Sequence, residues 1–274
     1  MAITAQDVNK LRQMTGMGMM DCKQALTEAD GDFDKAIEIL RKKGEKISAK
    51  RADNETKEGV VLIHNDNTEA VMLSLNCETE SVSKNDEFNS IAKLALDTAI
   101  AHKCTSAEVL LGTQVNGRTL QEVILEFTGK VGEKIVIGDY SYITGEQVVS
   151  YLHSNSKMGV LVALKGANGA DVLQAGKDVA MQIASMNPIA IDKEDVSAEV
   201  IEKEIEIGKE QARNEGKPEE MIEKIALGKL NKFYKEATLL NQEFVKDNSK
   251  SVRQMLQGIS KDLTVSAFKR ISVV

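Results

Sequence analysis

The sequence has 274 residues, 42% of them hydrophobic and 28% charged, which is enough for a small domain plus a larger one. Its formal net charge of -7 repels a phosphate backbone, so general nucleic-acid binding would require a local basic patch. No apolar run approaches the roughly 18 residues of a membrane helix, and the first residues lack the pattern of a secretion signal. We therefore expect a cytoplasmic protein with no membrane partner.

The three cysteines, Cys22, Cys77 and Cys104, form no C-x-x-C pair. An odd set without such a pair argues against both a disulfide framework and a zinc site. Cys22 and Cys77 lie next to apolar positions, where a cysteine packs as a small hydrophobic side chain. We therefore expect a reducing compartment, no bound metal and no cofactor.

Residues 1–45 have the pattern of three short helices. Thr4 and Asp7 have capping-box spacing at the start of the first helix, the glycines of TGMGMM separate it from the second, and Gly44 is expected to close the third. The apolar positions at helical spacing are Val8, Leu11 and Met14, then residues 19–26, then Phe33, Ala36, Ile37 and Leu40. A module of this size is near the lower limit for independent folding.

Residues 46–57 are predicted to form a basic linker, continuous with the cation-rich stretch RKKGEKISAKR at 41–51. This stretch has no aromatic residue that would stack on a base, so we interpret it as a solvated segment. The alternative is an RNA-binding segment, whose affinity would fall steeply with salt. The negative net charge argues against that alternative, and we expect no direct nucleic-acid partner.

From residue 58 the hydrophobic period changes from that of a helix to that of a strand. The segments 59–64 and 70–77, separated by the turn-forming NDNT, predict a β-hairpin. Ser83 and Asp86 then have capping-box spacing at the start of a helix. The apolar face of this helix consists of Phe88, Ile91, Ala92, Ala95 and Ala99.

The same order of elements recurs later in the chain. QVVSYLHS at 147–154 and MGVLVALKG at 158–166 predict a second hairpin. A helix follows, with Val172, Ala175, Val179 and Ile183 on one face. We therefore predict an internally duplicated core, with halves at 58–145 and 146–274 that bury their apolar faces against each other or in a shared sheet. His64 and His153 end equivalent strands.

The remaining segments complete an α+β fold. A capped helix and a strand at 134–143 lie between the two hairpins. The stripe of that helix consists of Leu120, Val123, Ile124 and Phe127. Residues 195–235 predict a projecting antiparallel hairpin of two charge-rich helices, with Pro218 in the first turn of the second. A helix near 252–259 and a strand ending in AFKRISVV return the chain to the second half.

Motifs of enzymes and nucleotide-binding sites are missing from the sequence. DGDFD at 30–34 begins like a calcium loop, but Lys35 and Arg41 occupy the positions of its glycine and glutamate, so a helix start is the better interpretation. GMGMMD lacks the third glycine of a dinucleotide fingerprint, and there is no P-loop. We expect no catalytic residues and no bond-making chemistry.

Five segments carry a resemblance to a known family. They are LRQMTGMGMMDCKQALTEADGDFDKAIEILRKKG in the first module, NCETESV at 76–82, GKVGEKIVI at 129–137, SYLHSNSKMGVLVALKG at 150–166 and the segment beginning DVSAEVIEKE at 195. Together they make the chain similar to the elongation factor Ts family over nearly its whole length. The resemblance implies that the first three helices form a ubiquitin-associated-like (UBA-like) module.

The resemblance also implies a function. Members of this family are guanine nucleotide exchange factors: they bind elongation factor Tu with GDP, promote GDP release by disturbing the magnesium and phosphate site, and stay bound until GTP binds. The implied partner is elongation factor Tu, in its GDP-bound and nucleotide-free states. The resemblance further implies that the helical hairpin, a coiled coil, serves self-association, as a homodimer or as a heterotetramer with the partner; a merely solvated hairpin is the alternative.

By the same resemblance Thr79, Glu80, Ser81 and Val82 match the segment that dislocates the partner's magnesium. The family has Asp-Phe after the threonine, whereas this chain has Glu80 and Ser81. Glu80 keeps a carboxylate, but Ser81 lacks the aromatic ring, which buries about 150–250 Å², worth a few kcal/mol. We hypothesise that Val82 or Phe88 supplies an apolar contact instead.

Further contacts follow from the resemblance. Val131 and Gly132 match a loop that meets the partner, and His153 matches a histidine near the partner's phosphate-binding loop; the alternatives are that Val131 is core and that His153 only ends a strand. The N-terminal contact consists of Arg12, Met19, Met20 and Lys23, with burial of Met20 in its own module as the alternative. Phe244 and Val245 match a contact to a distal domain of the partner, where Lys246 replaces a common methionine.

A different functional class stays open on fold alone. The three-helix module would then bind ubiquitin-like or nascent-chain ligands, with the duplicated core as a scaffold and no exchange activity. Such a module has no need of the NCETESV and SYLHSNSKMGVLV segments. Nucleotide release from elongation factor Tu separates the two functions.

Overall fold

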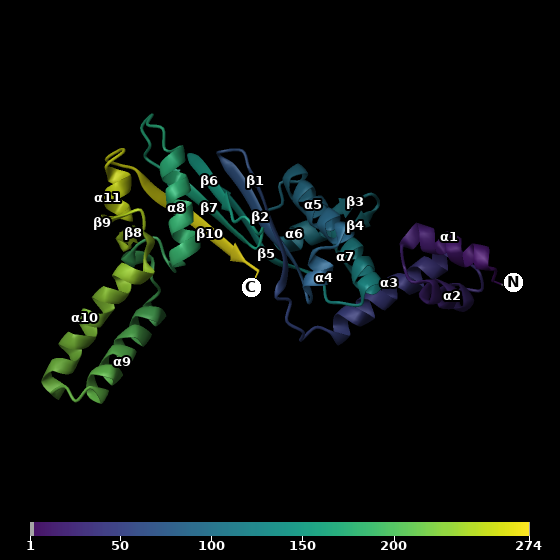
Figure 1. Ribbon diagram of the computed structural model, residues 1–274, viewed down its shortest axis with the longest axis horizontal. Coiled ribbons are helices and arrows are strands. Elements are labelled where there is room, and N and C mark those ends of the chain that lie inside the picture. The colour runs from purple at the N-terminus through teal and green to yellow at the C-terminus, as the bar shows by residue number, and fades with distance from the viewer. Residues whose placement is uncertain (1–2, 274) are drawn as a thin grey trace.

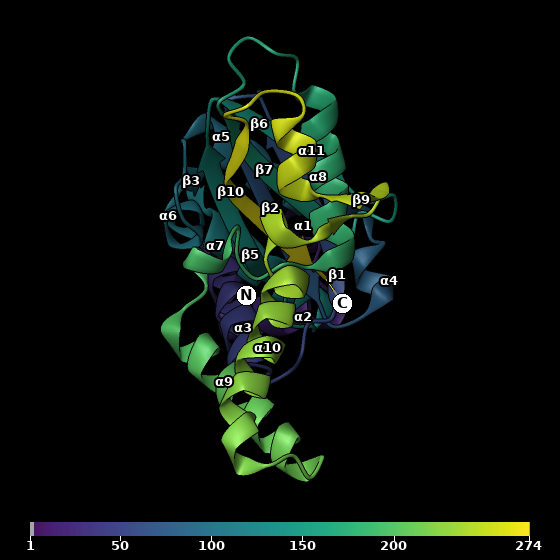
Figure 2. The same ribbon diagram turned by 90° about the vertical axis from the view of Figure 1, so that its left-hand side faces the viewer.

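The computed structural model describes residues 3–273 and has an elongated α+β fold (Figure 1). A three-helix module lies at one end, two small antiparallel sheets occupy the middle, and a long helical hairpin projects from the other end (Figure 1). Figure 2 shows that hairpin extending away from the sheets. No helix within the described residues combines the length and apolar character required of a membrane span.

The N-terminal module has the three predicted helices. They are α1 (Ala5–Thr15), α2 (Met19–Glu28) and α3 (Phe33–Lys50). The capping box of Thr4 and Asp7 is present, and Asp32 caps α3 by accepting from the backbone N–H groups of Asp34 and Lys35, which confirms the interpretation of DGDFD as a helix start. Leu11, Cys22, Leu26 and Leu40 form part of the module's core.

The third helix is longer than the sequence predicted, because Gly44 does not close it. It continues to Lys50, so the predicted basic linker at 46–57 is reduced to 51–57. Gly44 lies against α7 (Leu120–Val131), and a Cβ added there would be 2.0 Å from the Leu125 carbonyl oxygen. The glycine allows close contact between the two helices, which offsets its cost of roughly 1 kcal/mol inside a helix.

The cation-rich stretch at 41–51 is not a free solvated segment. Lys43 Nζ lies 2.6 Å from a carboxylate oxygen of Asp21, within the module. Arg51 Nη1 lies 2.6 Å from a carboxylate oxygen of Glu78, in the core. These pairs neutralise part of the positive charge, which weakens the case for RNA binding further.

The first half of the core is a three-stranded sheet in the order β1-β2-β5, covered by helices. Its elements are β1 (Glu58–Asn65), β2 (Glu69–Cys77), α4 (Glu80–Ser83), α5 (Asp86–Ala101), α6 (Ala107–Gly112), β3 (Gln114–Val115), β4 (Arg118–Thr119), α7 and β5 (Val136–Thr144). The predicted apolar face of α5 is buried. Asn85 caps this helix in place of Ser83, because Ser83 belongs to the short helix α4.

The second half repeats this plan with strands β6 (Gln147–Leu152), β7 (Met158–Lys165) and β10 (Thr264–Ser272) and with helix α8 (Leu173–Met186). Its sheet has the order β6-β7-β10, so in both halves the hairpin supplies an edge strand and the central strand, and a later strand completes the sheet. Each long helix packs on its own hairpin. This confirms the predicted duplication.

The two halves contact each other reciprocally: the hairpin turn of each bonds the first strand of the other. The Val61 N–H of β1 donates to the Ser156 carbonyl oxygen at 2.7 Å, and the Val148 N–H of β6 donates to the Asn67 carbonyl oxygen at 2.6 Å. Side chains from both sheets form one core between them, with Met72 and Leu161 fully buried. Each half therefore buries an apolar face against the other, as the sequence predicted.

The predicted helical hairpin consists of α9 (Ala198–Asn214) and α10 (Glu219–Ala237). Pro218 immediately precedes α10 and does not lie in its first turn. Gly208 of α9 faces Ala226 of α10, and a Cβ on the glycine would be 3.1 Å from the Ala226 Cα. This close contact favours a glycine in α9.

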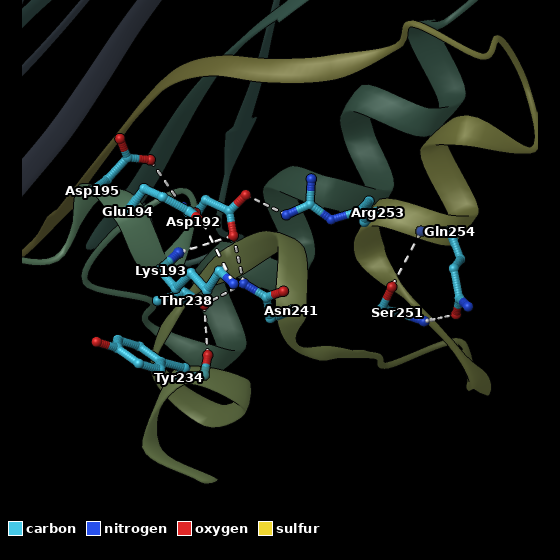
Figure 3. Close-up of polar contacts among 10 residues, drawn as sticks. All are labelled: Asp192, Lys193, Glu194, Asp195, Tyr234, Thr238, Asn241, Ser251, Arg253 and Gln254. Carbon is cyan, nitrogen blue, oxygen red and sulfur yellow. Dashed lines mark hydrogen bonds and ion pairs between the residues drawn. The ribbon is translucent and has the colours of Figure 1, made fainter. Parts of the chain in front are cut away.

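A polar cluster holds the base of this hairpin on the second half (Figure 3). Asp192 accepts from the Lys193 N–H at 2.9 Å and from Asn241 Nδ2 at 2.7 Å, and it pairs with Arg253. The short elements around the cluster are η1 (Lys193–Asp195), η2 (Leu239–Asn241), β8 (Glu243–Phe244), β9 (Asp247–Ser251) and α11 (Val252–Gln257). Asp192 therefore joins the hairpin base to α11.

Candidate functional site

The segment Thr79–Val82 leaves the central strand of the first sheet and forms the first turn of α4. Thr79 is its N-cap. The Thr79 N–H donates to one carboxylate oxygen of Glu133 at 3.1 Å, and its hydroxyl donates to the other at 2.8 Å. Glu133 directly follows Gly132, a left-handed residue that ends α7. Segments 54 residues apart are thus joined, which brings Val131 and Gly132 beside Thr79–Val82.

Glu78 connects two further segments to this one by hydrogen bonds. Its carboxylate accepts from the Lys134 N–H at 2.7 Å, from Asn54 Nδ2 at 2.9 Å and from Arg51 Nη1 at 2.6 Å. Burial opposes ionisation, but these hydrogen bonds and the charge of Arg51 hold the pKa of Glu78 below its usual value. An ionised Glu78 therefore fixes the start of the Thr79–Val82 segment against two other segments.

Glu80 and Ser81 are both exposed at this joint. Lys84 lies one turn further along, with its Nζ 2.8 Å from a carboxylate oxygen of Glu80. The hydrogen bond and the charge of Lys84 lower the pKa of Glu80. Glu80 therefore presents a negative charge to solvent, held by a cation that a stronger partner could replace.

The hypothesis that Phe88 replaces the missing aromatic contact is wrong. Its side chain is completely buried, and its ring centroid lies 6.4 Å from that of Phe127 inside the first half. Val82 is half-buried and packs against the same core. Val82 is therefore the only one of the two that has accessible surface next to Ser81.

The turn that contains His153 lies beside this segment because of the contact between the two halves. Lys157 Nζ, in that turn, lies 2.7 Å from a carboxylate oxygen of Glu58, and Glu58 is paired in register with Cys77, just before Thr79. After Lys84, the charge of Lys157 also lowers the pKa of Glu80. The turn of residues 153–157 therefore lies near the segment of Glu80, although the two come from different halves, and both His153 and Glu80 are exposed.

The predicted N-terminal contact residues lie on the surface of the first module. Met20 is 75% exposed and Met19 is 52% exposed, and Arg12 and Lys23 are exposed as well. The alternative in which Met20 is buried in its own module is therefore wrong. Exposed methionines beside two cations form a surface suited to a protein partner.

Phe244, predicted to contact a partner, is buried in the core of the second half. Val245 is 44% exposed, and its N–H donates to Gln182 Oε1 at 2.9 Å. Lys246 Nζ lies 2.8 Å from a carboxylate oxygen of Asp178 on α8. The prediction for Phe244 is corrected to core packing, and Val245 alone of the pair faces solvent.

Sequence patterns did not point to the residues that assemble the site. Glu78, Glu133 and Lys157 act through partners far away in the chain, so no local spacing distinguishes them from other charged residues. Tyr151 was also missed, although its hydroxyl lies 2.8 Å from Nδ1 of His153. The alternation of β6 places these two side chains on one face of the strand, which is the one feature of the sequence that links them.

Comparison with known proteins identifies a family for this chain. A family described as elongation factor TS matches residues 78–274. Elongation factor Ts of Cytophaga hutchinsonii is 60% identical over 274 residues, which cover 99% of each chain. Elongation factor Ts of Amoebophilus asiaticus is 55% identical over 275 residues, covering 100% of this chain and 99% of that protein. The chain therefore belongs to the elongation factor Ts family of translation elongation factors.

Proposed function

We propose that this chain is a guanine nucleotide exchange factor for elongation factor Tu, a non-enzymatic partner that makes and breaks no bond. It binds the GDP-bound form, promotes GDP release by disturbing the magnesium and phosphate site, and remains bound until GTP enters. The observation that supports this most is the common face formed by Thr79–Val82, Val131–Gly132 and the turn of His153. A scaffold without exchange activity has no need of such a face.

Glu80 is the group that acts on the magnesium and phosphate site in this proposal. Its carboxylate is ionised and exposed, so it repels phosphate oxygens and competes for a hard cation. Two unit charges 4 Å apart interact by about 1 kcal/mol in water and about 4 kcal/mol at a protein surface. One carboxylate placed close to the nucleotide is therefore enough for a tenfold or larger effect on GDP affinity.

The anchored start of α4 makes this interaction effective. The hydrogen bonds of Thr79 to Glu133 and of Lys134 to Glu78 fix the backbone before Glu80. A carboxylate on a fixed turn loses little conformational freedom when the partner binds. The charge therefore acts on the partner and not on the local structure of this chain.

Ser81 leaves the exchange reaction without an aromatic wedge. In the proposal Val82 provides the small apolar contact that remains at this position, while His153 contributes a second contact from the other half. Val131, which is half-buried against the core of the first half, and Gly132 lie beside the same face. Because coupling between two ligands is reciprocal, GDP must weaken the binding of this chain by the factor by which the chain weakens GDP.

The N-terminal module supplies a separate docking contact in this proposal. Helices α1 and α2, which carry Arg12, Met19, Met20 and Lys23, lie at the far end of the molecule from the helical hairpin (Figure 1), and Val245 adds a contact on the second half. Several contacts on one partner raise the effective concentration of each. Exposed Met221 and Leu227 on the hairpin are the candidate contacts for a homodimer or a heterotetramer.

Release of a fluorescent GDP from elongation factor Tu of the same organism tests the proposal. The loaded partner is mixed with excess unlabelled nucleotide, with and without this chain at increasing concentration. We expect acceleration that falls at least tenfold in Glu80→Ala, falls in His153→Ala and rises in Ser81→Phe. Glu210→Ala, which removes an exposed carboxylate from α9, is the matched control and should act like the unchanged chain. Binding without acceleration at any concentration would leave the scaffold function in place of exchange.

A further inference from the structure

The imidazole of His153 forms a hydrogen bond with a tyrosine two residues earlier in the chain. The Tyr151 hydroxyl oxygen lies 2.8 Å from His153 Nδ1, and the two ring centroids are 6.0 Å apart. Tyr151 is half-buried and packs against the core of the second half, whereas His153 is exposed just beyond the end of β6. The phenol ring therefore connects the rigid core to the exposed imidazole.

The backbone of His153 is fixed independently of this contact. Its N–H donates to the Met158 carbonyl oxygen at 2.9 Å, and its carbonyl oxygen accepts from the Ser156 N–H at 2.8 Å. The turn is tied on both sides, because Ser156 accepts from Val61 of β1 and the Val273 N–H donates to the Lys157 carbonyl oxygen at 2.8 Å. What remains free in His153 is the rotation of its ring and the choice of tautomer.

A hydrogen bond to Nδ1 restricts both of these freedoms. It selects one orientation of the ring, and it leaves Nε2 as the ring nitrogen that faces outward. A neutral imidazole carries one proton, so Nε2 carries it when the Tyr151 hydroxyl donates to Nδ1 and lacks it when the hydroxyl accepts from Nδ1. An exposed histidine without such a partner samples several rotamers and both tautomers.

The duplicated half provides an internal comparison. His64 occupies the equivalent place in β1, and the residue two positions before it is Leu62, which cannot hydrogen-bond an imidazole. A histidine therefore occurs at this position of the hairpin whether or not a tyrosine hydroxyl stands two residues before it. The hydroxyl is present in the half whose turn lies beside Glu80.

We propose that Tyr151 is a positioning residue for His153: its hydroxyl donates to Nδ1, which sets the ring orientation and keeps the proton on Nε2, the nitrogen that meets elongation factor Tu. This inference rests on the proposed function, because His153 is a contact only if the chain docks with this face. Tyr151 itself does not touch the partner. The effect of removing its hydroxyl is therefore expected to require the presence of His153.

The test is Tyr151→Phe, which removes one oxygen and keeps the packing of the ring. In the free chain, nitrogen NMR of the histidine side chains should show one predominant His153 tautomer, and the variant should move its ring-nitrogen signals toward those of His64. In GDP release the variant should be slower by about 3- to 10-fold, the range expected for losing one hydrogen bond. Tyr234→Phe, on the remote hairpin, should change neither readout.

Three outcomes would overturn the inference. The first is an unchanged His153 nitrogen spectrum in Tyr151→Phe. The second is an exchange loss in Tyr151→Phe that adds fully to that of His153→Ala, since a positioning residue has nothing left to position once the imidazole is gone. The third is a loss of folded structure in Tyr151→Phe, measured by circular dichroism, because the hydroxyl would then stabilise the fold and not only position the imidazole.

The NMR arm needs no partner protein, so it separates this inference from the proposed function. If the unchanged chain fails to accelerate GDP release, the exchange proposal fails, and the spectrum still shows whether the hydroxyl sets the tautomer. If exchange is normal and the spectrum does not respond to Tyr151→Phe, the positioning role fails alone.

Discussion

The two halves of the core share one strand order but differ at the ends of their hairpins. In the first half the central strand β2 leads into α4, which presents Glu80 and Ser81. In the second half the central strand β7 turns sharply at Gly166, where a Cβ would lie 2.2 Å from the Asp262 carbonyl oxygen, and an exposed turn at Asn168 and Gly169, in place of a short helix, leads to α8. The hairpin turns differ as well, since the second carries the Tyr151–His153 pair.

The elements that the halves share have a different role from the segments in which they differ. The reciprocal contact places the hairpin turn of each half next to the first strand of the other half. That symmetry would generate two equivalent faces, but only one combines α4, the loop of Glu133 and the turn of His153. In the proposed function, the common scaffold fixes relative positions, and the segments in which the halves differ provide the contacts to the partner.

The largest expected effect comes from separating the halves. Leu161→Ala empties a completely buried position in the core shared by the two sheets, so the free energy of unfolding should fall by about 2–5 kcal/mol. Urea denaturation measures the change. Leu173→Ala, at an exposed leucine in the first turn of α8, is the control and should change it by about 0.5 kcal/mol or less. Equal effects of the two substitutions would contradict a shared core.

A second substitution tests how the first half holds its helical module. Gly44→Ala should lower the free energy of unfolding by about 1–3 kcal/mol, because the added methyl group meets the backbone of α7. Gly228→Ala is the matched control, since no atom lies within 4 Å of its added Cβ. It should stabilise α10 by up to about 1 kcal/mol. Stabilisation by both substitutions would show that α3 and α7 do not pack closely.

Alkaline pH should weaken the first half before the second. Burial raises the pKa of Cys77 to about 12, with a contribution from Glu133 and Glu58, and burial raises the pKa of Tyr140 to about 12. Both groups hold their protons more tightly in the folded chain, so their contribution to stability is complete below about pH 9 and decreases as the pH rises toward 12.

Hydrogen exchange at increasing pH, corrected for the intrinsic rate, measures this loss in each half. Cys77→Ala should show a shallower decline than the unchanged chain, because one of the two groups is gone. A decline of equal size in both halves, or one that Cys77→Ala leaves unaltered, would contradict the assignment.

The smallest effect on stability is expected from the ion pair that connects the halves. Lys157→Ala breaks the half-buried pair with Glu58 and should cost about 1 kcal/mol or less. GDP release should nevertheless slow, because the turn of His153 loses one of its two links to β1 and keeps only the backbone hydrogen bond between Val61 and Ser156. Lys232→Ala, which breaks an exposed pair on the hairpin, should leave release unchanged. An equal effect of both variants on release would show that the link does not matter.

Local patterns were sufficient to predict most of the fold. The strand period identified both hairpins, and capping-box spacing located α1 and α7. The order of strands and helices then indicated the duplication. These features depend on neighbouring residues, so a sequence read in one pass contains them.

The errors share a cause in tertiary contacts. A glycine after a helical stretch often ends the helix. Gly44 instead lies inside α3, where the close approach of α7 leaves no room for a Cβ. Ser83 and Asn85 are both good caps, and the four-residue helix α4 is too short to produce a periodic pattern. Phe244 and Val245 alternate between core and solvent, but the sequence does not state which faces which way. The hydrogen bond between Thr79 and Glu133 and the ion pair between Lys157 and Glu58 connect segments that are far apart in the sequence.

The most direct test of one face built from both halves is hydrogen–deuterium exchange of the chain with and without nucleotide-free elongation factor Tu. We predict that residues 78–84, 130–134 and 153–157 become protected together, while the turn at 66–68, which has the equivalent place in the other half, does not. Protection of only one of the three segments, or of 66–68 in place of 153–157, would contradict the account.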